Sequence, residues 1–324
     1  MALRTRLTEK LGITHPVLLA PMGTIAGGRL AGTVSEAGGL GLIGGGYGEQ
    51  VWLERELAAA GNRRIGCGFI TWSLAKKPHL LDLVLAHQPA AVMLSFGDPR
   101  PFASRIAAAG TVLICQVQRR DHVREALDAG ASIIVAQGSE AGGHGGGRST
   151  LALVPAVVDL VARRAPEAIV IAAGGIADGR GLAAALALGA EGVLVGTRFY
   201  ATVESLGQQK AKMRILASSG EDTVRTSVFD AVRGYDWPDG VTGRALRNDF
   251  TERWHGHERE LALALVSERT RYQESVASGD VDTAVVFAGE GAGLVEDVPQ
   301  AGEVVRRIVA EAENALRAAR SHIA

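Results

Sequence analysis

One histidine stands in a glycine-rich segment that directly follows an apolar run. The segment reads QGSEAGGHG and covers residues 137–145. His144 has an unperturbed pKa of about 6.5, so it could serve as a general base at neutral pH. The amide of Gln137 could hydrogen-bond a flat ring, and Gly142 and Gly143 would let the backbone pass close to a bound cofactor. We therefore expect His144 to lie on a flexible loop above a cofactor site.

Two further glycine-bearing segments each end an apolar run. Gly174 and Gly175 lie in AAGGIADG, and Gly196 and Thr197 lie in VGTRF. Bare backbone N–H groups at neighbouring strand ends, with a helix N-terminus at Asp178 beside them, are typical of the phosphate site that (β/α)₈ barrels build after strands seven and eight. The alternative is that these glycines serve only tight turns.

A third segment, APMG at residues 20–23, has small residues that leave room for a flat ring. We expect Met22 to place its backbone N–H against the edge of the ring and its side chain against the ring itself. The alternative is a core methionine followed by a turn. Ala20 stands beside it at the same predicted strand end.

The elements that must position these segments recur along the chain. An alanine-rich amphipathic stretch ends in Ala-Gly or Leu-Gly, and a short apolar, β-branched run follows. The glycine is the expected stop of a helix, and an apolar run without alternation fits a parallel strand covered on both faces. Strands are predicted at 17–20, 40–43, 65–70, 90–95, 112–116, 132–136, 168–173 and 192–195. Eight such units favour an α/β fold, a (β/α)₈ TIM barrel, over a doubly wound open sheet, which usually stops at five or six strands.

The repeating pattern breaks near residue 205. We expect residues 1–205 to form the barrel and residues 206–299 to form a cover of helices and loops over its mouth. Residues 300–324 are expected to contain a C-terminal helix that packs on the barrel. Its apolar face would carry Val304, Val305 and Ile308.

The composition excludes several classes of protein. A net charge of −1 and 5% aromatic residues give no reason to expect a nucleic-acid or membrane partner. Cys67 and Cys115 lie in apolar runs, as buried reduced thiols do, and the N-terminus has no apolar signal region, so a cytoplasmic protein is expected. His255 and His257 have no second ligand cluster, so no metal is expected.

The motifs APMG, QGSEAGGHGG, AAGGIADGRG and VGTRF together resemble the nitronate monooxygenase family, formerly called 2-nitropropane dioxygenases. The resemblance covers about residues 5–205 and weakens through RALRND (244–249) and FAGEGAGLV (287–295). The QGSEAGGHGG element is specific to this superfamily, whereas the glycine loops are shared with many FMN barrels.

The resemblance implies an FMN enzyme that oxidises alkyl nitronates, and in some members nitroalkanes, with O₂ to a carbonyl compound and nitrite. His144 would remove the proton α to the nitro group, or orient a preformed nitronate. The partners would be this small-molecule substrate and O₂, and a homo-oligomer is left open. By position, the residues that would hold FMN are Ala20, Met22, Gln137, Gly142, Gly143, Gly174, Gly175, Gly196 and Thr197.

The sequence departs from the family at two places. Many members have an asparagine on the third strand, where this chain has Gly68, so Thr71 or Trp72 is expected to line the site instead. The insert at 226–240 could cap the substrate pocket with Tyr235 or Trp237 as a wall, or simply pack on the surface.

Three other functions remain open from the sequence. One is an NAD(P)H-dependent FMN reductase, of the quinone or enoyl-ACP type, on the same barrel. The others are a non-catalytic FMN-binding barrel and a flavin-free phosphosugar enzyme, because the barrel alone does not determine the activity.

Overall fold

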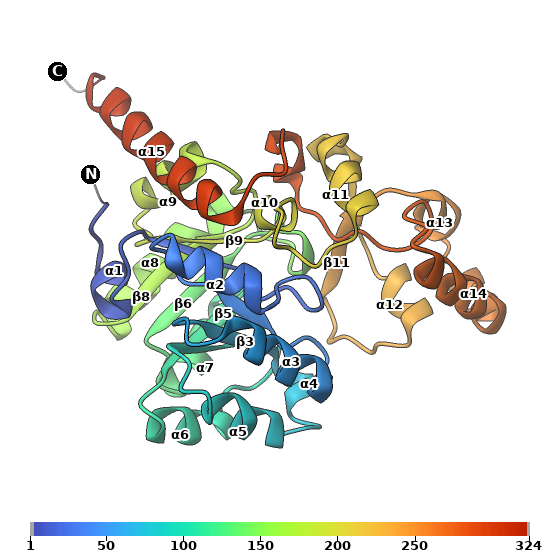
Figure 1. Ribbon diagram of the computed structural model, residues 1–324, viewed down its shortest axis with the longest axis horizontal. Helices are drawn as coiled ribbons and strands as arrows, with labels where there is room; N and C mark the ends of the chain where they lie inside the picture. The colour runs from blue at the N-terminus through green and yellow to red at the C-terminus, as the bar shows by residue number, and fades with distance from the viewer. Residues whose placement is uncertain (1–2, 323–324) are drawn as a thin grey trace.

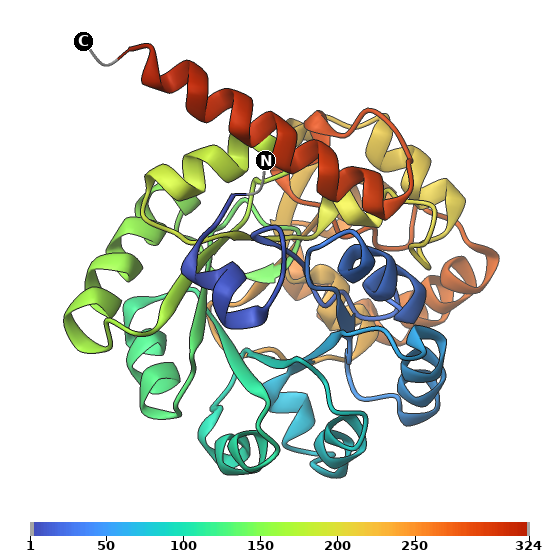
Figure 2. The ribbon, with the colours of Figure 1, turned by 60° about the vertical axis from the view of Figure 1, so that its left-hand side comes forward.

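The computed structural model describes residues 3–322 and contains a barrel of eight parallel strands. The sheet order is β1-β9-β8-β6-β5-β4-β3-β2. A parallel bridge between Leu18 and Leu40 joins the two ends of this order, with Leu40 donating its N–H to the Val17 carbonyl at 3.1 Å. The predicted (β/α)₈ barrel is therefore confirmed, and Figure 2 shows helices surrounding the strands. The strands are β1 (Val17–Leu19), β2 (Leu42–Gly44), β3 (Gly66–Ile70), β4 (Ala91–Ser95), β5 (Val112–Val117), β6 (Ile133–Gln137), β8 (Ile169–Ala173) and β9 (Val193–Val195).

The strands carry continuous apolar runs because both of their faces are buried. Leu18, Met93 and Ile171 belong to a cluster inside the barrel, whereas their neighbours Val17 and Val92 pack outward against the helices. Successive side chains of a strand point to opposite faces, so an apolar residue is needed at every position.

The helices of the outer ring follow the strands in the expected order. Glycines such as Gly130 (φ 80°) and Gly189 (φ 89°) end helices in the left-handed conformation, as the sequence predicted. The helices are α2 (Gly28–Glu36), α3 (Gln50–Ala60), α4 (Thr71–Leu74), α5 (His79–Leu85), α6 (Arg100–Ala108), α7 (Arg120–Asp128), α8 (Thr150–Arg164), α9 (Gly179–Ala187) and α10 (Thr197–Tyr200). An additional helix, α1 (Arg6–Leu11), precedes the barrel.

The segment after the barrel contains strands as well as helices. Strands β10 (Thr223–Thr226) and β11 (Thr242–Leu246) form an antiparallel sheet with β7 (Gly143–Gly145), which comes from the barrel loop after β6. The segment that we expected to form helices and loops therefore also contains these two strands. His144 pairs with Gly243 in this sheet, so the expectation that it lies on a flexible loop is also wrong.

Helices and loops make up the rest of this segment, which extends away from the barrel in Figure 1. They are α11 (Gln209–Leu216), α12 (Val228–Arg233), α13 (Asp249–Trp254) and α14 (Glu258–Ser278), with short 3₁₀ turns η1 (Gly220–Asp222) and η2 (Glu290–Leu294).

The C-terminal helix α15 (Ala301–Arg320) packs against α9 and α2. Its buried face carries Val304, Val305 and Ile308. The chain returns to the barrel between α14 and α15, where the Gly289 N–H donates to the Thr197 hydroxyl at 2.9 Å. The division of the chain at residues 205 and 299 stays a prediction.

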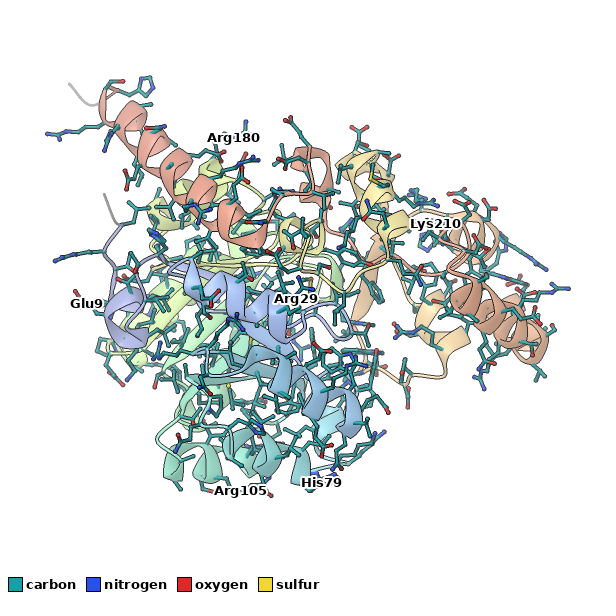
Figure 3. The ribbon with its side chains drawn as sticks, viewed as in Figure 1. Glu9, Arg29, His79, Arg105, Arg180 and Lys210 are labelled. Carbon is teal, nitrogen blue, oxygen red and sulfur yellow. The ribbon has the colours of Figure 1, made fainter. Side chains whose placement is uncertain are left out.

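Charged side chains project outward over the molecule, as Arg29, Arg180 and Lys210 illustrate in Figure 3. No helix among residues 3–322 is both long enough and apolar enough to cross a bilayer.

Candidate active site

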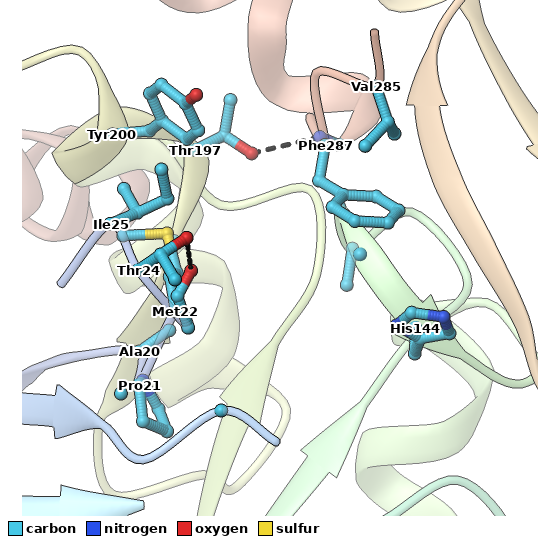
Figure 4. A pocket seen from close by; sticks show the side chains of 18 of the residues that line it. Ala20, Pro21, Met22, Thr24, Ile25, His144, Thr197, Tyr200, Val285 and Phe287 are labelled. Carbon is cyan, nitrogen blue, oxygen red and sulfur yellow. Dashed lines mark hydrogen bonds between the residues drawn. The ribbon is translucent and has the colours of Figure 1, made fainter. Parts of the chain in front are cut away.

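A cavity of about 620 Å³ lies at the carboxyl ends of the barrel strands, beside the appended segment. Its volume falls in the range of roughly 300–1,000 Å³ that is usual for ligand and cofactor sites. In Figure 4, Ala20, Met22 and Thr197 lie on one side of it and His144 on the other. The structure brings all the site residues expected from the sequence to the lining of this cavity: Ala20, Met22, Gln137, Gly142, Gly143, His144, Gly174, Gly175, Gly196 and Thr197.

His144 forms a pair with Asp230, a residue of α12 that the sequence did not single out. The histidine Nε2 lies 2.9 Å from each carboxylate oxygen, and the two side chains are 9% and 7% exposed. The carboxylate accepts a hydrogen bond from Nε2, which leaves Nδ1 as the nitrogen with a free lone pair. The Asp230 contact therefore selects the nitrogen that could accept a proton.

The surroundings of His144 favour its neutral form. Burial lowers the pKa of the imidazole below its usual value, while the hydrogen bond and charge of Asp230 oppose this change. The cationic side chains of Arg233 and Arg225 lower the pKa further. The histidine is thus unprotonated at neutral pH, which is the form that a base requires.

Gln137 holds the histidine strand in place. Its Nε2 donates to the His144 carbonyl at 3.0 Å, and its Oε1 accepts from Gln116 at 3.1 Å and Gln118 at 3.0 Å. Both lone pairs of the Gln137 amide oxygen are used, as is one of its two N–H groups. Only the second N–H could therefore make the expected hydrogen bond to a ring. Gln116, which also lines the cavity, was not foreseen.

Two arginines from the appended strands hold the loop that carries His144. Arg225 donates to the carbonyl oxygens of Ser139 (2.9 Å), Gly145 (3.1 Å) and Thr242 (2.6 Å). Arg244 donates to Ser139 at 2.9 Å. These bonds explain why a segment rich in glycine forms an ordered strand at β7.

The loops after β8 and β9 present backbone donors to the cavity. Gly174 and Gly175 adopt left-handed conformations (φ 107° and 70°) that favour glycine. The N–H groups of Gly175, Gly196 and Thr197 donate no hydrogen bond to any described residue. Unpaired N–H groups at neighbouring strand ends are suited to a phosphate.

The helix expected to assist this phosphate site does not do so. At the N-terminus of α9, Gly181 N–H donates to Asp178 (3.1 Å) and Gly179 N–H donates to Glu311 of α15 (2.8 Å). Two carboxylates already occupy this helix end, so it would not attract a phosphate. The sequence could not reveal Glu311, which lies more than 130 residues further along the chain.

The expected role of the Met22 backbone is wrong. Its N–H donates to the Ala20 carbonyl at 2.9 Å in a tight turn, so it is not free to meet a ring edge. The Met22 side chain does line the cavity, and its sulfur would lie 3.7 Å from a Cβ placed on Gly196.

The presence of Gly68 on the third strand, where many members of the resembled family have an asparagine, has a steric cause. A Cβ on Gly68 would lie 2.3 Å from the Pro21 Cγ, so Pro21 fills the space beside this strand. Thr71 and Trp72 do not replace the missing side chain, because neither is among the described residues that line the cavity. Thr71 is buried, and Trp72 packs against Tyr47 with ring centroids 5.9 Å apart.

The insert at 226–240 supplies one wall of the cavity. Trp237 stacks on the His144 ring with centroids 3.5 Å apart and an angle of 8° between the planes. Tyr235 stacks on Tyr47 at 3.6 Å, and Trp237 Nε1 donates to the Tyr47 hydroxyl at 3.1 Å. The insert therefore caps the cavity. The aromatic residues of RGYDWPDG are the signal that pointed to it, whereas Tyr47 stands in a glycine-rich turn and was not foreseen.

Other chemistries have no support in the part of the chain that the structure describes. Residues 3–322 contain no group of three or more His, Cys, Asp or Glu side chains that could hold a metal. Burial raises the pKa of both Cys67 and Cys115 to about 12, so neither is a reactive thiolate.

The fold and cavity define a (β/α)₈ barrel enzyme with a buried histidine in the cavity at the carboxyl ends of its strands. The family model described as "Nitronate monooxygenase" matches residues 4–62 and 71–311. The chain belongs to the nitronate monooxygenase family, a family of flavin-dependent oxidoreductases. The interval between the two matched stretches contains Gly68, where the chain departs from the family pattern.

Individual relatives cover nearly the whole chain. A nitronate monooxygenase from Neurospora crassa is 34% identical over 94% of this chain and 90% of its own length. A (3aS,4S,5R,7aS)-5-hydroxy-7a-methyl-1-oxo-octahydro-1H-indene-4-carboxyl-CoA dehydrogenase from Rhodococcus jostii is 31% identical over 96% of both chains. The solved structure of FabK from Thermotoga maritima has a TM-score of 0.85 and 32% identity, and the similarity covers 99% of this chain and 100% of that one.

Proposed function

We propose that this enzyme uses FMN and O₂ to oxidise alkyl nitronates to a carbonyl compound and nitrite, with His144 at the reacting carbon. The observation that carries this proposal is the buried contact of Asp230 with Nε2 of His144, a cavity residue, which leaves Nδ1 of a neutral imidazole free. A neutral nitroalkane would be a second substrate, because its α-proton needs such a base.

The residues present fit FMN. The backbone N–H groups of Gly175, Gly196 and Thr197 have no hydrogen-bond partner among residues 3–322 and would hold the phosphate. Gly142 allows the loop that carries His144 to pack directly on the backbone of Ala288, since a Cβ at position 142 would lie 2.6 Å from that backbone. Ala20, Met22, Gln137, Gly143 and Gly174 complete the lining on which the ring would rest. The bound flavin would accept electrons from the substrate and deliver them to O₂.

The protein supplies position and proton transfer. For a neutral nitroalkane, Nδ1 of His144 would take the proton from the α-carbon, and Asp230 would stabilise the resulting imidazolium. For a preformed nitronate no proton is removed, and His144 would orient the anion. Trp237 and the other aromatic side chains around the histidine exclude water from this proton transfer.

Anaerobic stopped-flow spectroscopy tests this function. The FMN-loaded enzyme is mixed with an alkyl nitronate and, separately, with NADH or NADPH. We expect fast loss of the oxidised flavin absorbance with the nitronate and none with the nicotinamides. His144→Asn should slow reduction by a nitroalkane by roughly 10²–10⁴-fold, whereas the exposed His79→Asn should not. Reduction by a nicotinamide alone would contradict the proposal.

A second candidate is an NAD(P)H-dependent FMN reductase, of the quinone or enoyl-ACP type. The similarity to the Rhodococcus jostii protein favours it, because a protein of comparable identity is named as a dehydrogenase of a CoA thioester. The nicotinamide arm of the stopped-flow experiment separates the two functions.

A further inference from the structure

Arg233 is the only lysine or arginine among the described residues that line the cavity. The carboxylates of the lining are Glu49 and Glu140. The Glu49 side chain is 75% exposed and lies 3.7 Å from Lys77, and Glu140 accepts hydrogen bonds from Thr150 at the start of α8. Arg233 is therefore the one permanent cation of this lining, and these carboxylates have other partners.

The guanidinium of Arg233 has unused donors. It makes no hydrogen bond with any residue of 3–322, and its Nη1 is buried. The nearest carboxylate oxygen, Asp230 Oδ1, lies 4.0 Å away, which is too far for a hydrogen bond. A partly buried guanidinium with five N–H donors and no acceptor is costly unless a ligand supplies the acceptor.

Aromatic rings fix the position of this cation. Its Cζ lies 4.7 Å from the ring centroid of Tyr235, 5.5 Å from that of Tyr47 and 5.7 Å from that of Phe287. Phe287 also contacts His144, with centroids 5.4 Å apart. The guanidinium is thus held beside the histidine by contacts with aromatic rings, and no described side chain accepts a hydrogen bond from its Nη1.

Asp230 lies between His144 and Arg233 but accepts no hydrogen bond from the Arg233 guanidinium. Both of its oxygens accept from His144 at 2.9 Å, and Arg233 stands one helical turn further along α12. Arg233 and His144 both contact Phe287 and both line the cavity, so a substrate bound beside the histidine is also close to the guanidinium. The two oxygens of a nitro group match the planar fork of a guanidinium.

We propose that Arg233 binds the negatively charged oxygens of the substrate and makes this site selective for the anionic nitronate over the neutral nitroalkane. This inference rests on the proposed function. Neither Arg233 nor its aromatic surroundings belong to the cofactor loops, so its effect is on the choice of substrate.

Binding of inorganic nitrate tests the anion site without turnover. Nitrate is a planar anion that resembles the nitronate group, and it is titrated into the FMN-loaded enzyme while the flavin absorbance is followed. Because a charge-assisted hydrogen bond is lost, Arg233→Gln should raise the Kd for nitrate by at least about tenfold. Arg233→Lys keeps the charge but loses the fork, and should give an intermediate Kd.

The matched control is Arg259→Gln, which removes the same charge from an exposed position on α14. It should leave the Kd for nitrate unchanged. Circular dichroism establishes that each variant is folded, and Arg233→Lys carries the test if the glutamine variant does not fold. Failure of the wild-type enzyme to bind nitrate, or an equal Kd in the wild type and the Arg233 variants, would overturn the inference.

A kinetic comparison separates this inference from the proposed function. Anaerobic flavin reduction is measured with a nitronate and with the nitroalkane of the same carbon chain. Arg233→Gln should reduce the ratio of the nitronate rate constant to the nitroalkane rate constant by at least about tenfold. An unchanged ratio would contradict the role of Arg233 and leave the proposed oxidation untouched. If wild-type flavin is not reduced by the nitronate but nitrate binding still depends on Arg233, the proposed oxidation fails and the anion site stands.

Discussion

Asp230 contacts Nε2 of His144, so under the proposed function its removal should change proton transfer at the histidine and leave FMN binding unchanged. In Asp230→Asn the group that raises the histidine pKa is lost, and burial together with Arg233 and Arg225 continues to lower that pKa. The acidic limb of the pH profile of kcat/KM for a nitroalkane should therefore move to lower pH. The plateau value of kcat/KM should fall on the order of tenfold or more, because an amide in place of the carboxylate no longer fixes the proton on Nε2 of His144.

The measurement is the pH dependence of kcat/KM for the wild type and Asp230→Asn, with FMN binding measured in parallel. Equal FMN affinity together with a shifted limb is the expected result. An unshifted acidic limb would show that Asp230 does not act through His144.

Gly68 permits the close packing of β3 against Pro21, so a side chain at this position should destabilise the barrel. In Gly68→Ala the new Cβ would lie 2.3 Å from the Pro21 Cγ and 2.5 Å from its Cβ. The expected loss is about 1–3 kcal/mol in the free energy of unfolding, as for overpacking elsewhere. Urea denaturation measures it, and Gly147→Ala is the control because a Cβ at Gly147 meets no atom within 4 Å. A Gly68→Ala protein as stable as this control would contradict the steric explanation of the sequence departure.

Individual residues were predictable from sequence where their role depends on local backbone. Gly175 and Gly196 could be placed because a strand followed by glycine specifies a loop at the carboxyl end of a barrel. Asp230 and Arg233 could not, since their partners lie on β7 and on barrel loops far away in the chain. The Met22 N–H was misjudged because a turn within the segment itself uses that donor.

At the level of elements, the strand β7 depends on arginines of β10 and β11. Arg225→Met should remove its hydrogen bonds to the carbonyls of Ser139, Gly145 and Thr242, of which Ser139 keeps its bond from Arg244. The free energy of unfolding should fall by at least about 2 kcal/mol, and amide hydrogen exchange should speed up in residues 139–145. Arg259→Met, on an exposed helix face, is the control for the loss of charge. Unchanged exchange in residues 139–145 would show that the loop is held by other contacts.

The barrel strands were predictable to within a few residues because parallel strands are buried on both faces and appear as apolar runs. Strands β10 (TVRT) and β11 (TGRAL) are short and polar, and β7 is a glycine–histidine–glycine stretch. No local pattern indicates that these three segments pair, since the sheet forms only when the appended segment meets the barrel. The amphipathic C-terminal helix was predictable because its apolar period of about 3.6 residues is a local property.

At the level of the whole molecule, three partly buried histidines should make stability depend on pH. Burial lowers the pKa of His15, His122 and His144 below the usual value of about 6.5. In the unfolded chain each gains a proton as the pH falls through 6.5, whereas the folded protein resists protonation. The contribution of these histidines to the free energy of unfolding is therefore fully present above this pH. It decreases below this pH by up to about 1.4 kcal/mol per pH unit for each histidine.

Urea denaturation at pH 7.5 and at pH 5.5 measures this effect. The unfolding free energy should be lower at pH 5.5, and His15→Gln and His122→Gln should each reduce the difference. Equal stability of the wild type at both pH values would contradict the lowered pKa values.

The sheet formed by β7, β10 and β11 also has a consequence for how such enzymes diverge. The glycine loops after β8 and β9 belong wholly to the barrel, whereas Asp230, Arg233 and Trp237 are all contributed by the insert that joins β10 to β11. Sequence drift or recombination within this insert can therefore alter the wall of the cavity around His144 while the barrel loops on its other side are left intact. Relatives that share the barrel can acquire new substrates through this one segment.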